Sequence, residues 1–141
     1  MINLIKAQGP FDGLMGFSEG GGVAATLLVE DSRRPFAGFK CAIFFCASPA
    51  LDPDQIRTGV QRNISHEIDG VVVNIPTAHI WSKGGNIWPD MGQSVVPLCQ
   101  EKLREEFIHR LGHTIPGAHS AEGLKDTVRI IERTIEKSKE N

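Results

Sequence analysis

The serine at position 18 lies in the segment Gly16-Phe17-Ser18-Glu19-Gly20, which matches the pattern G-x-S-x-G. In proteins with this pattern, a sharp turn between a strand and a helix exposes a serine hydroxyl that acts as a nucleophile. The flanking residues fit that context, because the apolar run 12–17 predicts a buried strand and residues 23–28 predict a helix. The sequence therefore predicts Ser18 as a catalytic nucleophile.

The glycines beside Ser18 suit such a turn. A serine at a sharp turn has strained backbone angles, and side chains two positions away, at Gly16 and Gly20, would collide. The N-terminus of the following helix directs its free N–H groups toward the serine oxygen. We therefore expect the backbone N–H of Glu19 to be one donor of an oxyanion hole.

A second candidate is His113, which follows the last predicted strand, residues 105–110, and precedes the last predicted helix. A serine early in the chain and a histidine late is the order found in α/β-hydrolases. We therefore predict His113 as the general base. His109, at the end of a strand, is a more distant competitor. The remaining histidines are interpreted as a core residue, His79, and two surface residues, His66 and His119.

Strand and helix patterns alternate along the chain, which is typical of a mostly parallel α/β sheet. We predict one domain over residues 1–141, with about four to five strands flanked by helices. Besides 12–17, the predicted strands are 39–46, 76–81 and 105–110, with a short extended piece at 70–73. Residues 94–103 predict a helix, and the polar segment 52–69 predicts a loop or cap.

The C-terminal helix is predicted from apolar residues that recur at helical spacing. We expect them to form its buried face: Leu124, Val128, Ile131 and Ile135. Ser120 suits the N-cap, and Lys137 and Lys139 suit the C-terminal end of the helix dipole.

Composition excludes several functional classes. The formal net charge is −2 and the basic residues are scattered, so the sequence does not predict a nucleic-acid-binding surface. No apolar run approaches the length of about 20 residues that spans a membrane, and no signal peptide is recognised. Three cysteines, Cys41, Cys46 and Cys99, indicate reduced thiols in a cytoplasmic setting. No residues have metal-ligand spacing, and the match of 20–25 to G-x-G-x-x-A lacks the required strand context, so we expect no metal or cofactor.

Four motifs in order resemble the FSH1-type serine hydrolase family, which has the α/β-hydrolase fold and includes thioesterase-like hydrolases of fungal polyketide clusters. They are residues 9–20, 39–45, 75–81 and 112–117. The resemblance implies a Ser–Asp–His triad that acts on esters or thioesters without a cofactor. It also implies that Ser18 is the nucleophile and His113 the base.

The chain departs from the family pattern at the acid. Gly85 stands where the family has its aspartate. Asp90, five residues later, is the candidate acid if the loop is rearranged, and Asn86 could orient the imidazole ring without neutralising its charge. In a serine protease, replacing the triad aspartate with asparagine costs roughly 10⁴ in kcat.

The chain resembles roughly the last two-thirds of the family fold, so we expect the usual N-terminal strands and a second oxyanion donor to be missing. The strand before Ser18 would then be an exposed edge. We expect this edge to pair with a second copy or another chain, or to be covered by an N-terminal segment.

Three functional hypotheses follow. The first is acyl hydrolysis through an acyl-Ser18 intermediate, with residues 52–69 and the loop around Trp88 lining the acyl pocket. The second is a degenerate hydrolase fold that binds a ligand or partner without turnover. The third is a lyase, cyclase or isomerase that uses His113 as an acid or base.

Overall fold

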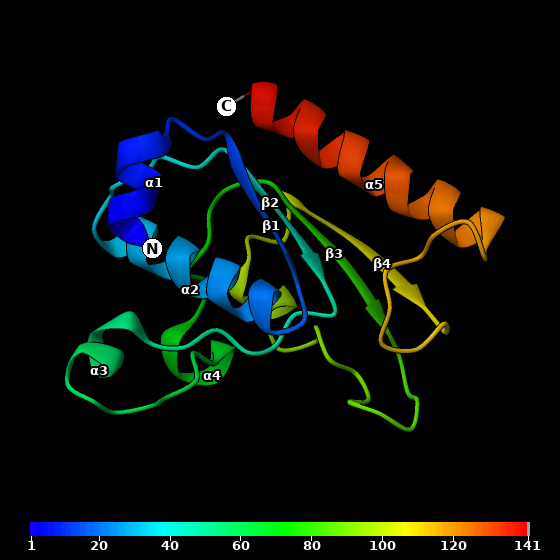
Figure 1. Cartoon of the computed structure of the whole chain (residues 1–141), viewed down its shortest axis with the longest axis horizontal. Helices are drawn as coiled ribbons and strands as arrows, with labels where there is room; N and C mark the ends of the chain where they lie inside the picture. The colour runs from blue at the N-terminus through cyan, green and yellow to red at the C-terminus, as the bar shows by residue number, and fades with distance from the viewer. Residues whose placement is uncertain (141) are drawn as a thin grey trace.

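The computed structural model describes residues 1–140 and contains one sheet of four parallel strands. The strands lie in the order of the sequence: β1 (Gly13–Phe17), β2 (Cys41–Phe45), β3 (Thr77–Ser82) and β4 (Arg104–His109). In the register, Gly16 lies opposite Phe44, and Phe44 lies opposite His79. The expectation of an α/β fold with a parallel sheet of about four to five strands is confirmed (Figure 1).

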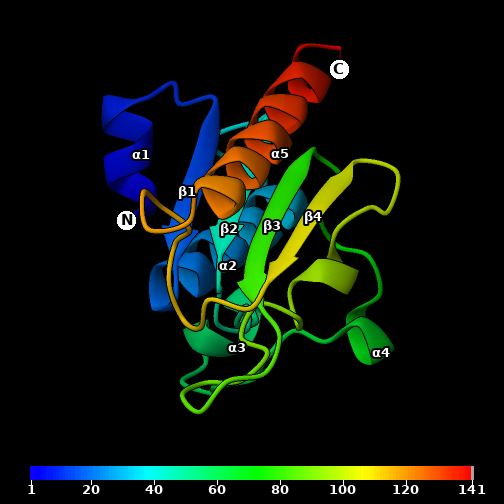
Figure 2. The same cartoon turned by 90° about the vertical axis from the view of Figure 1, so that its right-hand side faces the viewer.

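Two long helices cover the two faces of the sheet (Figure 2). One is α2 (Glu19–Arg33), which packs on β1 and β2, and the other is α5 (Ala121–Lys139), which packs on β2, β3 and β4. The remaining helices are short: α1 (Ile2–Gln8), α3 (Pro53–Arg57), α4 (His66–Asp69) and the 3-10 helix η1 (Val96–Leu98). This arrangement puts the C-terminal ends of all four strands at one edge of the sheet, with the loops that follow them.

The apolar core has a layer on each face of the sheet. Leu28 and Val29 of α2 pack with Phe44 in one layer, and Ile130 of α5 packs with Ile80 in the other. The central strands are covered on both sides, so their sequences are nearly continuous apolar runs. All six residues of β3 are buried.

The predicted helix over 94–103 is wrong. Only Val96–Leu98 is helical, as a single 3-10 turn, and the chain on either side is irregular. Pro97 contributes to the difference, because it lacks the backbone N–H that would donate a hydrogen bond in the interior of a longer helix.

The C-terminal helix forms as predicted, but only part of its predicted buried face is buried. Leu124, Val128 and Ile135 are each about 40% exposed, whereas Ile131 packs against the core. The fully buried residues of the helix are Gly123, Thr127, Ile130 and Thr134. Most of the side chains on this face are small, so the helix can pack closely. The buried Thr134 hydroxyl donates a hydrogen bond to the Ile130 carbonyl. The predicted N-cap is confirmed, since the Ser120 hydroxyl accepts from the Gly123 N–H.

The polar segment 52–69 forms α3 and α4 with irregular connections, and charged side chains attach it to α2. Arg33 pairs with Asp52 at 2.8 Å, and Arg57 pairs with Glu30 at 2.6 Å. The predicted extended piece at 70–73 contributes only an isolated bridge between Val73 and Cys99. No helix within residues 1–140 combines the length and the apolar character needed to cross a membrane.

Candidate active site

Ser18 lies at the sharp turn between β1 and α2. Its backbone angles are φ 55° and ψ −122°, which an L-residue rarely adopts and which cost about 1–3 kcal/mol. Two hydrogen bonds, one to the last residue of β2 and one to the chain that follows it, fix this geometry. The Ser18 N–H donates to the Phe45 carbonyl, and the Ser18 carbonyl accepts from the Ser48 N–H, both at 2.9 Å. The turn therefore holds the serine hydroxyl at the C-terminal edge of the sheet.

Small residues permit the close packing around this turn. A Cβ added at Gly16 would meet the backbone of Gly20 and Gly21, and one added at Gly21 would lie 2.6 Å from the Cβ of Ala47. The expectation that a side chain at position 16 would collide is thus confirmed, and the atoms it would meet are backbone atoms of the next helix. The expectation for Gly20 is wrong, because a Cβ there would meet nothing within 4 Å.

His113 lies beside Ser18, although 95 positions separate them in the sequence. Its Nε2 is 3.0 Å from the Ser18 Oγ. The imidazole ring is held between two aromatic rings, Phe17 and Trp88, each with a centroid distance of 4.9 Å. The geometry brings together the predicted nucleophile and the predicted base at hydrogen-bond distance, as proton transfer requires.

The other ring nitrogen of His113, Nδ1, is buried and has no hydrogen-bond partner among the described residues. A buried polar group without a partner costs about 1–3 kcal/mol. Asp90, the candidate acid, does not bond to this nitrogen. Its Oδ1 instead accepts from the Gly84 N–H at 2.6 Å and so closes the loop after β3. Gly85, at the position where an acid was expected, has φ +107° and open space where a Cβ would point.

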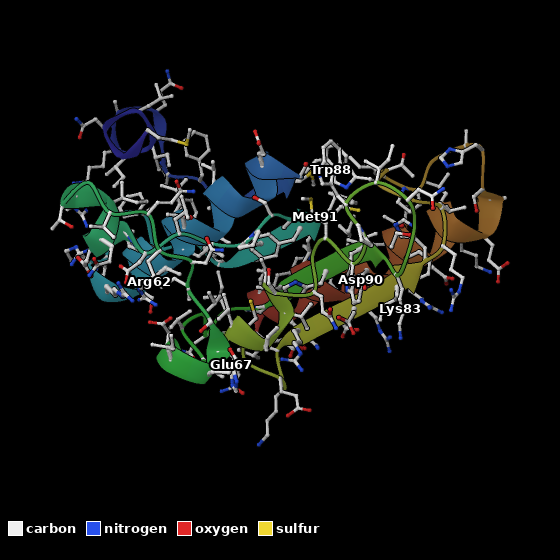
Figure 3. The ribbon with its side chains drawn as sticks, turned by 90° about the horizontal axis from the view of Figure 1, so that it is seen from below. Arg62, Glu67, Lys83, Trp88, Asp90 and Met91 are labelled. Atoms are coloured by element: carbon white, nitrogen blue, oxygen red, sulfur yellow. The ribbon has the colours of Figure 1, made fainter. Side chains whose placement is uncertain are left out.

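The loop after β3, residues 83–93, lies over the serine and the histidine. Trp88 contacts the His113 ring edge-on, and the Met91 Sδ lies 3.8 Å from the Ser18 Oγ. Figure 3 shows Trp88 and Met91 close together, with Asp90 farther along toward Lys83. Positive φ angles at Trp88 and Asp90 allow the tight path of this loop.

The N-terminal end of α2 offers a donor beside the nucleophile. Glu19 is the first residue of the helix, so its N–H has no partner within the helix. A cavity of about 560 Å³ has Glu19 among its lining residues and a mostly apolar wall that includes Val23, Leu27 and Ile56. Ser18 and His113 do not line this cavity, which lies on the side of Glu19.

The remaining histidines lie away from this constellation. His79 is buried in the core, where it stacks on Phe44, and burial lowers its pKa to about 3. Burial also lowers the pKa of His109, whose Nδ1 accepts from the Leu111 N–H. His66 and His119 are exposed, as expected. Their separation from Ser18 leaves His113 as the histidine that contacts the nucleophile.

The cysteines form no second reactive site. Burial raises the pKa of Cys46, and it raises that of Cys99 to about 12, so neither thiol favours the reactive thiolate. Within residues 1–140, no group of three or more histidine, cysteine or acidic side chains is arranged to hold a metal ion.

Sequence reasoning missed the contact of Met91 with the nucleophile. Met91 lies in an irregular loop with no periodic pattern, and only the path of the chain through Asp90 and Gly92 brings its sulfur to Ser18. No motif or spacing signals this contact. The proximity of Trp88 to the site could be expected, since the loop around it was predicted to line the pocket.

Comparison with known proteins agrees with this geometry. A sequence model described as "Serine hydrolase (FSH1)" matches residues 1–138. The chain is similar to Esterase FPY3 of Fusarium mangiferae, with 33% identity over 137 residues, which cover 95% of this chain and 61% of that protein. It is 31% identical to Hydrolase phiM of Talaromyces stipitatus, covering 82% of this chain and 48% of that protein. It is 27% identical to Esterase OVCA2 of Danio rerio, again covering 82% of this chain and 48% of that protein. The chain thus spans between about half and three-fifths of the length of these relatives.

Proposed function

Because the chain belongs to the serine hydrolase (FSH1) family, we propose that it hydrolyses an ester or thioester through an acyl intermediate on Ser18. The observation that carries the proposal is the 3.0 Å distance between the Ser18 Oγ and the His113 Nε2. The names of the similar proteins, two esterases and a hydrolase, support the same reaction class.

In the first half of the reaction, the Ser18 Oγ attacks the carbonyl carbon of the substrate and its proton passes to the His113 Nε2. The carbonyl oxygen takes up the negative charge, and the Glu19 N–H at the start of α2 stabilises it. The carbon–oxygen or carbon–sulfur bond then breaks. The leaving alkoxide or thiolate takes the proton from Nε2 and departs as an alcohol or a thiol.

In the second half, water attacks the acyl carbon and gives a proton to the His113 Nε2. The tetrahedral intermediate collapses, the carboxylic acid leaves, and the proton returns to the Ser18 oxygen. The free serine and the neutral imidazole are thereby restored, so the chain's own residues balance the proton transfers without a cofactor.

The apolar cavity that Glu19 helps to line suits the acyl group of the substrate. Val23, Leu27 and Ile56 contribute to its wall, and its volume of about 560 Å³ lies within the range of small-molecule sites. We therefore propose an apolar acyl chain as the substrate group. Polyketide or other secondary-metabolite acyl groups, which the family resemblance implies, are of this kind.

The proposal is tested by hydrolysis of a series of p-nitrophenyl esters and acyl thioesters of increasing chain length. Turnover should depend on Ser18 and improve with chain length until the cavity is filled. Ser18→Ala should reduce the rate to background while His79→Gln, a change in the buried core, serves as a control for a variant outside the site. Turnover that survives Ser18→Ala would favour the lyase or cyclase hypothesis and contradict the acyl-serine step.

One observation favours a second candidate function, binding without turnover. The His113 Nδ1 has no acid partner among residues 1–140, and a base without that partner is a weak catalyst. Under this alternative the apolar cavity binds a ligand, but no acyl-serine forms. Saturable binding of a fatty acyl thioester without release of thiol would support it.

A further inference from the structure

The unpartnered nitrogen of His113 has a consequence for the proton on the ring. For the Ser18 hydroxyl to donate its proton to Nε2, the imidazole must carry its own proton on Nδ1. In this structure that Nδ1–H would be buried without an acceptor. The productive tautomer is therefore disfavoured, and the imidazolium formed during attack has no anion beside it.

A cavity lies beside this ring. It has a volume of about 330 Å³ and is formed by His113 and Gly112 together with residues 85–88 of the loop after β3. Gly85 contributes no side chain to it, and a Cβ at that position would meet nothing within 4 Å. The wall includes the amide side chain of Asn86, a hydrogen-bond donor, but no charged side chain other than the imidazole when it is protonated.

We propose that this cavity takes a small carboxylate, which acts as the acid partner of His113. The inference rests on the proposed function, because it concerns the proton that His113 receives from Ser18. The carboxylate accepts the Nδ1–H, fixes the productive tautomer and stays ionised beside the imidazolium. No proton is transferred to it, as in a serine protease triad, where the aspartate remains ionised. Because the nitrogen is buried, the proposal requires a shift of the exposed Asn86 and Trp88 side chains that border the cavity.

The carboxylate acts mainly in the transition state. The cavity wall carries no permanent positive charge, so a free anion binds weakly to the resting site. Its attraction to His113 becomes strong only when the ring is protonated during attack. Interactions that strengthen in the transition state raise kcat.

The first test measures hydrolysis of a neutral p-nitrophenyl ester at increasing sodium formate or acetate, with sodium chloride at equal ionic strength as the control. We expect formate to raise kcat about tenfold or more, a fraction of the roughly 10⁴ that a triad acid supplies. Chloride should have no such effect. In Ser18→Ala, formate should produce no hydrolysis, because the carboxylate acts only through the Ser18–His113 pair.

The second test places an acid in the cavity. Gly85→Asp should raise the rate in the absence of formate and remove its effect, because the new carboxylate occupies the site. Gly85→Asn is the matched control, because it has the same size and tolerates a positive φ but carries no charge. It should leave the rate near that of the unmodified protein. Thermal melts verify that both variants are folded, and the formate titration needs neither variant.

If Ser18 reacts with a fluorophosphonate and the rate of hydrolysis is unchanged by formate and by Gly85→Asp, this inference is overturned and the proposed function still stands. If Ser18 neither reacts with the probe nor hydrolyses any ester, with or without formate, both are wrong.

Discussion

The His113 Nε2 lies 3.0 Å from the Ser18 Oγ, whereas the Nδ1 of the same ring is buried without a partner. The side of the ring that faces the nucleophile is thus at hydrogen-bond distance, whereas the opposite side lacks the acceptor that would hold a proton on Nδ1. An imidazolium formed during attack therefore has no anion beside it, unlike the imidazolium of a complete triad.

The strained backbone of Ser18 should lower the free energy of unfolding of the protein. Ser18→Gly, which adopts a positive φ without strain, should raise the free energy of unfolding by about 1 kcal/mol relative to Ser18→Ala. Both variants lose the same hydroxyl contacts, so the comparison isolates the backbone. Urea unfolding measures the difference, and equal stabilities would show that the turn is not strained.

Asp90 should act as a loop anchor, because its carboxylate accepts from the Gly84 N–H. Asp90→Asn keeps an oxygen acceptor and tolerates the positive φ at this position, but it removes the charge. Ester hydrolysis should therefore stay within about a factor of five of the unmodified protein. A fall of roughly 10⁴ in kcat would instead identify Asp90 as the acid of a rearranged triad.

Two buried carboxylates attach the α3–α4 segment to α2. Hydrogen bonds from Arg34 and Arg57 lower the pKa of Glu30 from 4.5 to about 2. Burial alone would raise the pKa of Asp52, but hydrogen bonds from Arg62 and Arg33 outweigh it and lower the pKa from 3.8 to about 2. A carboxylate with a lowered pKa in the folded state stabilises the fold while it is ionised.

The sign of the pH dependence follows from these pKa values. The stabilisation is complete above the unfolded-state pKa values near 4 and is lost as the pH falls toward about 2. Chemical unfolding at a series of pH values should show this loss. Glu30→Gln should lower stability at neutral pH by about 1–3 kcal/mol and flatten the acid part of the profile. An unchanged acid profile in this variant would contradict the role of the Glu30 pairs.

The edge of β1 should mediate self-association. β1 is the first strand of the sheet, and Met15 at its centre is 64% exposed, with Phe17 also partly exposed. An apolar free edge favours pairing with a second copy of the chain. Light scattering should show a mass that rises with concentration, and Met15→Lys should reduce that rise. A monomer at all concentrations would count against pairing at this edge.

The elements that position the site could be predicted because their signals are local. Three of these signals depend on a few neighbouring residues each: Gly16 before the turn at Ser18, the apolar runs of β2 and β3, and the N-cap at Ser120. His113 could be proposed from its place after the last strand, because parallel strands end at one edge of the sheet.

The features that escaped prediction depend on tertiary packing. Tertiary packing buries the face of α5 that contains Gly123 and Thr127, so the more apolar stripe containing Leu124 remains partly exposed. The contact of Met91 with Ser18 depends on the path of an irregular loop. Neither preference is visible in periodicity or spacing.

Activation of Ser18 by His113 is tested by reaction of the purified protein with a fluorophosphonate probe, with the modified residue located by peptide mass spectrometry. We expect an adduct on Ser18 that is absent in Ser18→Gly and forms much more slowly in His113→Ala, with thermal melts confirming that both variants are folded. Absence of any adduct on the folded protein, or an adduct on Ser18 that forms equally fast in His113→Ala, would contradict activation by His113.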